Sequence, residues 1–348
     1  RLEKGRVLMT LGSKQEPKRE FQSVLDGPRA VPPEVQDAIR CLLVQMDCPE
    51  CPSSWSGALV GGYTWDSNAT LGSSSFIEVA EQELEIDPSN RSDRLAVGTL
   101  LLNYQRVLNP CLTWQALAHY HIADNHRVND NDLEVWSIGT GLQASNGCDM
   151  LNGRVSLVAI ELMDASYQNQ IRNELSYDRI RCPYWNWGVG LDYSLRHHFA
   201  SPGASGLDRI RGYSVNVDWH CKALVGSCHQ IVGAIYYYYD HFPRAGGEPD
   251  RYNRFGGDLD YQYQWKPHVV LTGGVSYHHD QYKNYHQTFT STKRSDRQTE
   301  ERVSMILTVS DCFFIELKGE HTRNQSNIPT SDYESNRFTI QSTYLFGS

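Results

Sequence analysis

Large apolar and polar residues alternate along the stretch from Phe255 to Trp265. One set of alternating positions is apolar and aromatic, and it consists of Phe255, Leu259, Tyr261, Tyr263 and Trp265. The other set is polar, and it consists of Asp258, Asp260, Gln262 and Gln264. The pattern is interrupted at Lys266-Pro267 and resumes from Val269 to Tyr277. Because successive side chains of a strand point to opposite faces, this period of two predicts a hairpin with one apolar and one polar face.

The same pattern recurs from Trp55 to Phe346. The predicted strands cover approximately 55–66, 94–108, 112–126, 131–145, 150–164, 168–181, 184–199, 207–220, 229–242, 251–265, 268–282, 298–310, 313–325 and 334–346. Strands of soluble proteins usually have about 5–6 residues, whereas membrane-crossing strands need about 9–11 and are flanked by aromatic girdles. The pattern therefore predicts an all-β transmembrane barrel of about 14 antiparallel strands, an even number as in bacterial outer membranes.

Short turns alternate along the chain with connections that are mostly longer. The predicted short turns are Asn109-Pro110, Asn146-Gly147, Cys182-Pro183, Cys221 to Cys228, Lys266-Pro267 and Ser310-Asp311. The first of the longer connections is the acidic segment from Asn68 to Asp93. In outer-membrane barrels the short turns face the periplasm and the longer loops face the outside. We therefore expect the outer membrane of a Gram-negative bacterium, with both termini in the periplasm.

Residues 1–50 differ from the remainder of the chain, because their apolar residues recur at helical spacing. We expect a helix from Lys14 to Leu25, a second helix after Pro32-Pro33 and a linker, so that 1–50 is a periplasmic helical segment and 51–348 a barrel. The apolar face of the helix pair consists of Phe21, Leu25, Val35, Ile39, Leu42 and Leu43. A face of this size has to be covered, so we expect it to bind a partner; a simple plug or cap is the alternative.

The composition excludes several classes of protein. No run of about 18 apolar residues occurs, so the sequence predicts no transmembrane helix. The net charge of −9 argues against a nucleic-acid partner, which would favour a basic face. The chain begins with Arg1 rather than Met, and we expect that any signal peptide has been removed.

The nine cysteines are unusual for a barrel of this kind. Cys48 and Cys51 form one C-x-x-C motif, and Cys221 and Cys228 flank a predicted turn, so both pairs are candidate disulfides in an oxidising periplasm. The spacing alone proves neither. No second C-x-x-C, haem-attachment motif or HExxH occurs, so we expect no metal and no cofactor. A barrel hydrolase would need a Ser or Asp paired with His at the rim. Asp240-His241 and His279-Asp280 are candidates by composition only, and we expect no enzymatic activity.

The alternation assigns one face of each strand to lipid and the other to the lumen. Residues expected to face lipid include Phe255, Leu259, Tyr261, Val303, Met305, Leu307, Ile315, Leu317, Phe338, Ile340 and Tyr344. The expected lumen residues are Arg154, Arg172, Glu174, Asp178, Asp192, Arg196, Asp218, Asp258, Asp260, Glu316, Lys318 and Glu320. Two interpretations remain open: a wet, charged conduit that sets selectivity, or a closed lumen filled by salt bridges.

Small motifs at the junction of the two segments add a resemblance. The stretches Phe21-Gln-Ser-Val-Leu25, Val31-Pro-Pro-Glu-Val-Gln-Asp-Ala-Ile39 and Gly62-Tyr-Thr-Trp-Asp-Ser-Asn68, with the closing Tyr344-Leu-Phe346, resemble surface lipoprotein assembly modifiers. Members of that family carry periplasmic tetratricopeptide repeats followed by a barrel. The resemblance implies that residues 14–46 are a last repeat, and that the barrel translocates or assembles surface lipoproteins.

Two other functions stay open at this stage. The chain could be a passive diffusion porin for small solutes, which needs no periplasmic helices. It could also be a scaffold that anchors a periplasmic or surface complex. All three functions imply contact with outer-membrane lipid, and the first and third imply a protein partner, namely a lipoprotein or a periplasmic protein.

Overall fold

The computed structural model describes residues 15–25, 53–69, 77–79, 82–84, 92–109, 111–127, 132–146, 149–162, 165–182, 185–198, 210–226, 228–241, 252–285, 292–328 and 331–347. The chain divides into two compact units, Arg1–Ser54 and Trp55–Ser348.

The first unit contains helix α2 (Gln15–Leu25), which agrees with the helix expected from the apolar spacing. Phe21 is fully buried and Leu25 is partly buried. The hydroxyl of Ser23 donates a hydrogen bond of 2.9 Å to the carbonyl of Glu20. The expected second helix, with Val35, Ile39, Leu42 and Leu43, and the expected Cys48–Cys51 pair lie outside the described residues.

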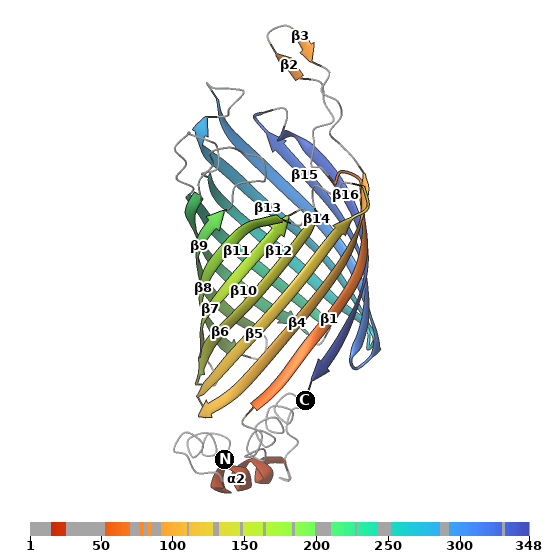
Figure 1. Ribbon diagram of the computed structural model, residues 1–348. Helices are drawn as coiled ribbons and strands as arrows, with labels where there is room; N and C mark the ends of the chain where they lie inside the picture. Colours follow the sequence, from red (N-terminus) through yellow and green to blue (C-terminus); the bar gives the residue numbers. More distant parts are fainter. Residues whose placement is uncertain are drawn as a thin grey trace. The chain divides into compact units, whose positions relative to one another are not determined.

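The second unit is a closed barrel of fourteen strands within the described residues, and every described ladder is antiparallel (Figure 1). The barrel strands are β1 (Ser53–Asp66), β4 (Asp93–Asn109), β5 (Leu112–Asn125), β6 (Leu133–Ser145), β7 (Asp149–Leu162), β8 (Ala165–Cys182), β9 (Trp185–His198), β10 (Ile210–Val225), β11 (His229–His241), β12 (Tyr252–Lys266), β13 (Val269–Tyr285), β14 (Lys293–Ser310), β15 (Phe313–Ser326) and β16 (Tyr333–Gly347). The predicted fold class and strand number are confirmed.

The first and last strands close the barrel. β1 pairs with β16 from Ser56 opposite Gly347 to Asp66 opposite Arg337. Side chains add to this ladder, because Thr64 and Thr339 share a hydrogen bond of 2.9 Å and Arg337 Nε lies 2.6 Å from Asp66 Oδ2. Closure pairs both edges of each described barrel strand, which is the condition for a sheet in lipid.

The connections mostly alternate in length as expected; the exception is the two-residue connection between β7 and β8, at the end where the other connections are longer. The connections between β4–β5, β6–β7, β8–β9, β10–β11, β12–β13 and β14–β15 have two or three residues and lie at one end of the barrel, here called the short-turn end. The opposite end is called the long-connection end. There, residues 67–92 contain a small hairpin that the sequence did not predict, β2 (Ile77–Val79) with β3 (Gln82–Leu84).

The predicted turn from Cys221 to Cys228 is wrong, because β10 continues to Val225 and the turn is only residues 226–228. Gly226 enables this tight turn with a positive φ of 75°. Cys221 therefore lies within the ladder opposite Gly233, four residues before the end of the strand. At about 3.3 Å per residue this places it roughly 13 Å up the strand from the turn, beyond the Cα separation of about 4.4–6.8 Å that a disulfide requires. Both cysteines carry thiols, so the predicted Cys221–Cys228 disulfide is also wrong.

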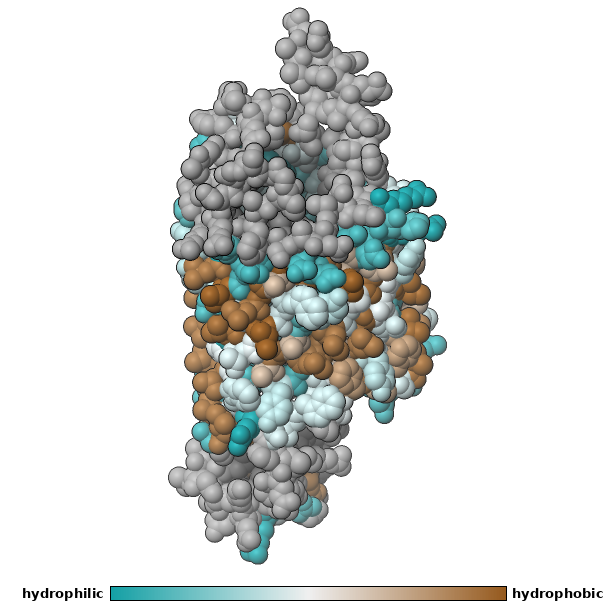
Figure 2. Space-filling view, viewed as in Figure 1, coloured by the Kyte–Doolittle hydropathy of each residue, from teal (hydrophilic) through white to brown (hydrophobic). Residues whose placement is uncertain are grey.

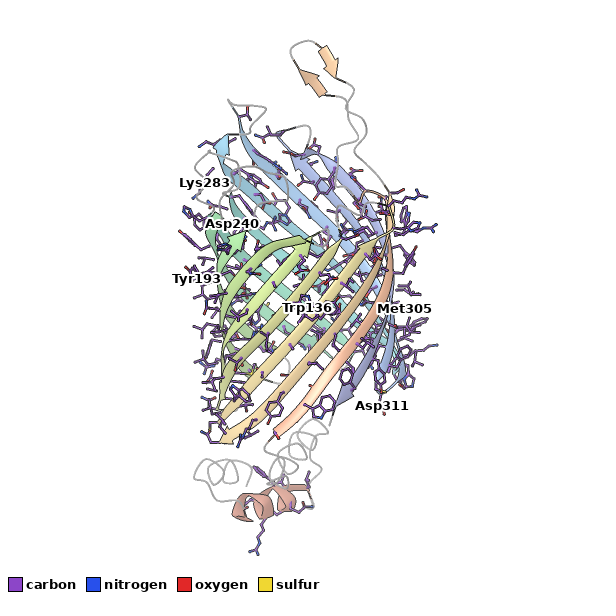
Figure 3. The ribbon with its side chains drawn as sticks, viewed as in Figure 1. Trp136, Tyr193, Asp240, Lys283, Met305 and Asp311 are labelled. Atoms are coloured by element: carbon purple, nitrogen blue, oxygen red, sulfur yellow. The ribbon has the colours of Figure 1, made fainter. Side chains whose placement is uncertain are left out.

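The outward face of the barrel is apolar. Side chains predicted to face lipid lie on it, with Phe255 60 % and Val303 66 % exposed. Figure 2 shows brown, hydrophobic side chains gathered in a belt over the barrel wall, and in Figure 3 Tyr193 and Met305 lie on the outside of that wall. An exposed apolar belt of this extent is costly in water and favourable in lipid.

Aromatic residues flank the apolar belt at both ends. Near the short turns the ring pairs are Trp55–Phe346, Tyr104–Trp114 and Tyr177–Trp187, with centroids 5.8, 5.7 and 5.8 Å apart. Near the long connections Tyr213 lies 6.2 Å from Tyr193 and 6.0 Å from Tyr239. Two aromatic girdles are typical of barrels at the two membrane interfaces. Among the described residues, no helix has the length and apolar character to cross a membrane.

Candidate functional site

The residues predicted to line the lumen all lie on the face of the wall opposite the exposed apolar belt. They are Arg154 on β7, Arg172, Glu174 and Asp178 on β8, Asp192 and Arg196 on β9, Asp218 on β10, Asp258 and Asp260 on β12, and Glu316, Lys318 and Glu320 on β15. The register shows the common face directly, because residues opposite each other in a ladder share a face. For example, Glu174 lies opposite both Arg154 and Asp192.

Ion pairs run along the lumen wall over β7, β8 and β9. Arg154 binds Glu174, and Arg172 binds Asp192. A nitrogen of Arg172 also lies 3.2 Å from Glu174. The charges therefore alternate along this part of the wall and neutralise one another. The side chains of Arg154 and Arg172 are nevertheless 40 % and 45 % exposed, so they border open space instead of filling a packed core.

A hydrogen bond and an ion pair join strands that are not neighbours. His220 on β10 lies 2.9 Å from Asp178 on β8, across Gly188 of β9. A nitrogen of Arg302 on β14 lies 2.8 Å from Asp260 on β12. Side chains two strands apart can meet only on the concave side of a sheet, and only if the intervening residue is small. The described wall meets both conditions on its inner face.

The other predicted lumen residues have partners nearby on the same face. Asp218 Oδ2 lies 3.0 Å from His220 Nδ1. Lys318 binds Glu320 at 2.6 Å, and Glu316 accepts a hydrogen bond of 2.6 Å from Gln341. Asp258 lies opposite Ser276 in the β12–β13 ladder.

Arginine, aspartate and tyrosine recur together on the lumen face toward the long-connection end. The ion pairs there are Arg196–Asp240 at 3.1 Å, Arg254–Asp280 at 2.7 Å and Arg294–Asp296 at 2.6 Å. Each arginine also lies over a tyrosine ring, respectively Tyr238, Tyr252 and Tyr282, with 5.9, 5.5 and 4.8 Å to the ring centroid. All three aspartates are buried. Buried charges of this kind need pairing. Arg254 donates hydrogen bonds to both carboxylate oxygens of Asp280, whereas Arg294 contacts only Oδ2 of Asp296, and the buried Oδ1 of Asp296 has no hydrogen-bond partner among the described residues.

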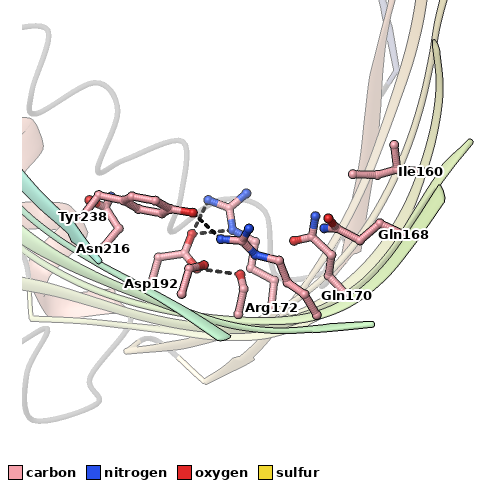
Figure 4. Close-up of a pocket in the computed structure, with 10 residues that line it drawn as sticks. Ile160, Gln168, Gln170, Arg172, Asp192, Asn216 and Tyr238 are labelled. Carbon is pink, nitrogen blue, oxygen red and sulfur yellow. Dashed lines mark hydrogen bonds and ion pairs between the residues drawn. The ribbon is translucent and has the colours of Figure 1, made fainter. Parts of the chain in front are cut away.

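A hollow in the lumen wall lies beside the first of these units (Figure 4). It has a volume of about 380 Å³ and is lined by Ile160, Gln168, Gln170, Arg172, Asp192, Ser194, Arg196, Ser214, Asn216 and Tyr238. The hollow exists because small residues separate the large ones. Ser194 and Ser214 lie opposite each other in the β9–β10 ladder and are both buried, between Arg172 and Asp240.

A bulge shapes one side of the hollow. Ile160 lies opposite Gln168, but the next residue, Glu161, lies opposite Ser166, so residue 167 has no counterpart in the ladder. Bulges re-aim neighbouring side chains. Gln168 is 95 % buried beside this bulge. In the described part of the chain the side-chain amides of Gln168, Gln170 and Asn216 form no hydrogen bond, and all three border the hollow.

Several site residues were not singled out in the sequence. They are Gln168, Gln170, Asn216, His220, Tyr238, Arg254 and Arg302. The signal that could have found them is their even position on strands whose large apolar residues, such as Ile171, Val217 and Val303, mostly occupy odd positions. The hollow itself depends on the bulge and on the two serines, and alternation cannot reveal it. Among the described residues, no three His, Cys, Asp or Glu side chains are grouped to hold a metal ion.

The closed antiparallel wall, the outward apolar belt with its two aromatic girdles and the charged inner face define a membrane-spanning β-barrel of the outer-membrane class. The chain matches no known protein family and no curated protein. The resemblance to surface lipoprotein assembly modifiers therefore stays a prediction.

Solved structures of outer-membrane proteins give weak likenesses. A loop-deletion mutant of OmpT of Vibrio cholerae has a TM-score of 0.49 at 9 % identity, over 84 % of this chain and 99 % of that chain. The channel DcaP of Acinetobacter baumannii has a TM-score of 0.47 at 8 % identity, over 84 % and 97 %. An outer membrane channel from Pseudomonas putida F1 has 0.45 at 14 %, over 83 % and 96 %. At identities this low, only the residues of this chain can indicate its function.

Proposed function

We propose that the barrel is a passive channel for small hydrophilic solutes in the outer membrane of a Gram-negative bacterium, with the short-turn end in the periplasm. The observation that carries this proposal is the exposure of the paired charges on the lumen wall. Arg154 and Arg172 have carboxylate partners and still expose 40 % and 45 % of their side chains. A lumen filled by salt bridges would bury them.

The side chains that line the hollow indicate which class of solute the channel favours. Arg172 and Arg196 are already bound to Asp192 and Asp240, so a charged solute would have to break existing ion pairs. The amides of Gln168, Gln170 and Asn216 are uncommitted. A side-chain amide both donates and accepts hydrogen bonds, as a hydroxyl group does. The wall therefore suits uncharged, hydroxyl-bearing solutes such as small sugars.

The test is a swelling assay on liposomes that contain the purified full-length chain, with arabinose, glucose and sucrose as solutes. We expect swelling well above that of protein-free liposomes, fastest with the smallest sugar. Swelling no faster than in protein-free liposomes would contradict the proposed channel.

The role of the hollow is tested in the same assay with Gln168→Leu. One lost hydrogen bond of roughly 0.5–1.5 kcal/mol should raise the half-saturating glucose concentration by about two- to thirteenfold. The control is Gln115→Leu, because the amide of Gln115 already binds Gln143 at 2.7 Å on another part of the wall. Equal behaviour of the two variants would leave the channel in place and remove the hollow from its mechanism.

Protein translocation is the second candidate function, and helix α2 is the observation that favours it. Phe21 in this helix is fully buried, so the first unit contains packed apolar structure that diffusion of small solutes does not need. Together with the family resemblance, this supports a role in presenting lipoproteins or other clients to the barrel. Deleting residues 14–46 separates the two functions: loss of lipoprotein display with unchanged sugar uptake would favour translocation, and unchanged display would rule it out.

A further inference from the structure

Cysteines are concentrated in the short turns of the barrel. Cys111 follows β4, Cys182 ends β8, Cys228 precedes β11 and Cys312 precedes β15. Cys148 lies in the connection between β6 and β7. Four of the six connections at the short-turn end therefore contain one cysteine each, Cys182 directly precedes a fifth, and the exception is Pro267-His268. These five residues are called the turn cysteines below.

The described turn cysteines are accessible. Cys111 and Cys228 are exposed and Cys312 is partly exposed, and all three carry thiols. In Figure 3, Asp311, the neighbour of Cys312, lies at the end of the barrel wall. Cys221 differs from them, because it lies within the β10 ladder and faces away from the lumen.

The turn cysteines in the described part of the chain are too far apart to pair within the wall. Successive short turns are separated by two strand spacings, which amount to about 9–10 Å. A disulfide requires Cα atoms about 4.4–6.8 Å apart. The hydrogen-bonded wall fixes this spacing, so closer approach would require breaking strand ladders.

We propose that the turn cysteines form disulfides between neighbouring copies of this chain in the membrane. The membrane itself favours a second copy as the partner. Two copies inserted in the same direction present their short turns at the same height, because the apolar belts of both must lie in the same lipid layer. The turn cysteines are spread over most of the circumference of the barrel. When two barrels lie side by side in the membrane, a thiol of one therefore lies at the same height as a thiol of the other in almost any relative rotation.

The chemistry requires an oxidant, which is a disulfide-bearing thiol oxidase of the periplasm. The thiolate of one turn cysteine attacks the disulfide of the oxidase, forming a mixed disulfide and releasing one oxidase thiolate. The turn thiolate of the neighbouring copy then attacks the sulfur of the first copy. A disulfide joins the two barrels, and the oxidase leaves as a dithiol that has gained two electrons and two protons.

The experiment uses the full chain in its native membrane, expressed in two differently tagged versions in one cell. Thiols are blocked with N-ethylmaleimide before solubilisation, and the proteins are separated without reductant. We expect dimers and larger species that contain both tags and disappear with dithiothreitol. Replacing all five turn cysteines with serine should abolish them, whereas the matched control Cys221→Ser should retain them.

Three results would overturn the proposal. The first is a monomer whose turn cysteines are all blocked by N-ethylmaleimide. The second is cross-linked bands that contain only one tag together with another protein. The third is mixed-tag species that persist in the five-serine variant, which would shift the linkage to other cysteines such as Cys48 and Cys51.

Discussion

Arg302 on β14 binds Asp260 on β12 across the strand that separates them, with Nη2 of the arginine 2.8 Å from Oδ1 of the aspartate. The residue between them is Gly274, which lies opposite Asp260 in one ladder and opposite Arg302 in the next. A Cβ atom at position 274 would overlap the carboxylate of Asp260 and lie 2.7 Å from Arg302 Nε. The ion pair can therefore form across β13 because Gly274 has no side chain.

Gly274→Ala should therefore break the Asp260–Arg302 pair and lower the free energy of unfolding. Gly273→Ala is the matched control, because a Cβ atom there has nothing within 4 Å. The two substitutions restrict the backbone in the same way, but the methyl group at position 273 faces lipid and the one at position 274 faces the lumen. The difference between them therefore reports the ion pair together with the burial of one methyl group in lipid. We expect Gly274→Ala to be less stable than Gly273→Ala by about 1 kcal/mol, the upper range for a partly exposed pair. Urea unfolding in lipid vesicles measures this difference, and equal stability would contradict the inferred role of Gly274.

The two faces of the wall can be compared at adjacent residues of β13. Val275 lies on the exposed apolar face, and Val275→Arg should cost about 2–4 kcal/mol near the midplane of the membrane. Ser276 lies on the lumen face between Asp258 and Glu300, so Ser276→Arg gains two acidic neighbours and should change stability little. Equal destabilisation by both variants in the same vesicle assay would mean that the inside and outside are wrongly assigned.

The alternation of apolar and polar residues was sufficient to predict the fold. A strand with lipid on one side and water on the other must alternate apolar and polar side chains along its membrane-spanning length. The alternation placed Glu174, Asp192 and Asp260 on one face without knowledge of their neighbours. The pairing of Asp260 with Arg302 could not be predicted in this way, since it depends on the register of three strands and on Gly274. The predicted turn from Cys221 to Cys228 begins too early, because Lys222 to Val225 continue the ladder.

The ion selectivity of the proposed channel should depend on Arg172. Arg172→Ala removes the charge that neutralises Asp192 and Glu174, so the lumen becomes more negative there. We expect the reversal potential in a KCl gradient across a planar bilayer to shift toward the potassium equilibrium potential. Arg323→Ala is the control, because Arg323 pairs with Glu334 at 3.3 Å and both side chains are more than half exposed on the outer face. A shift of the same size in both variants would show that overall charge, and not the lumen, sets selectivity.

The orientation of the barrel is the assumption shared by the channel and the disulfide proposals. It is tested with a membrane-impermeant maleimide on intact, reduced cells. Arg127→Cys, beyond the end of β5 at the long-connection end, should be labelled in the five-serine background, and Cys111 of the unmodified chain should not. Permeabilising the outer membrane should then make Cys111 reactive, since its side chain is exposed. Labelling of Cys111 but not of Arg127→Cys on intact cells would reverse the orientation. The turn cysteines would then face the medium, where a periplasmic oxidase cannot reach them, so the proposed route to linked barrels would fail, while sugar diffusion through the lumen would remain.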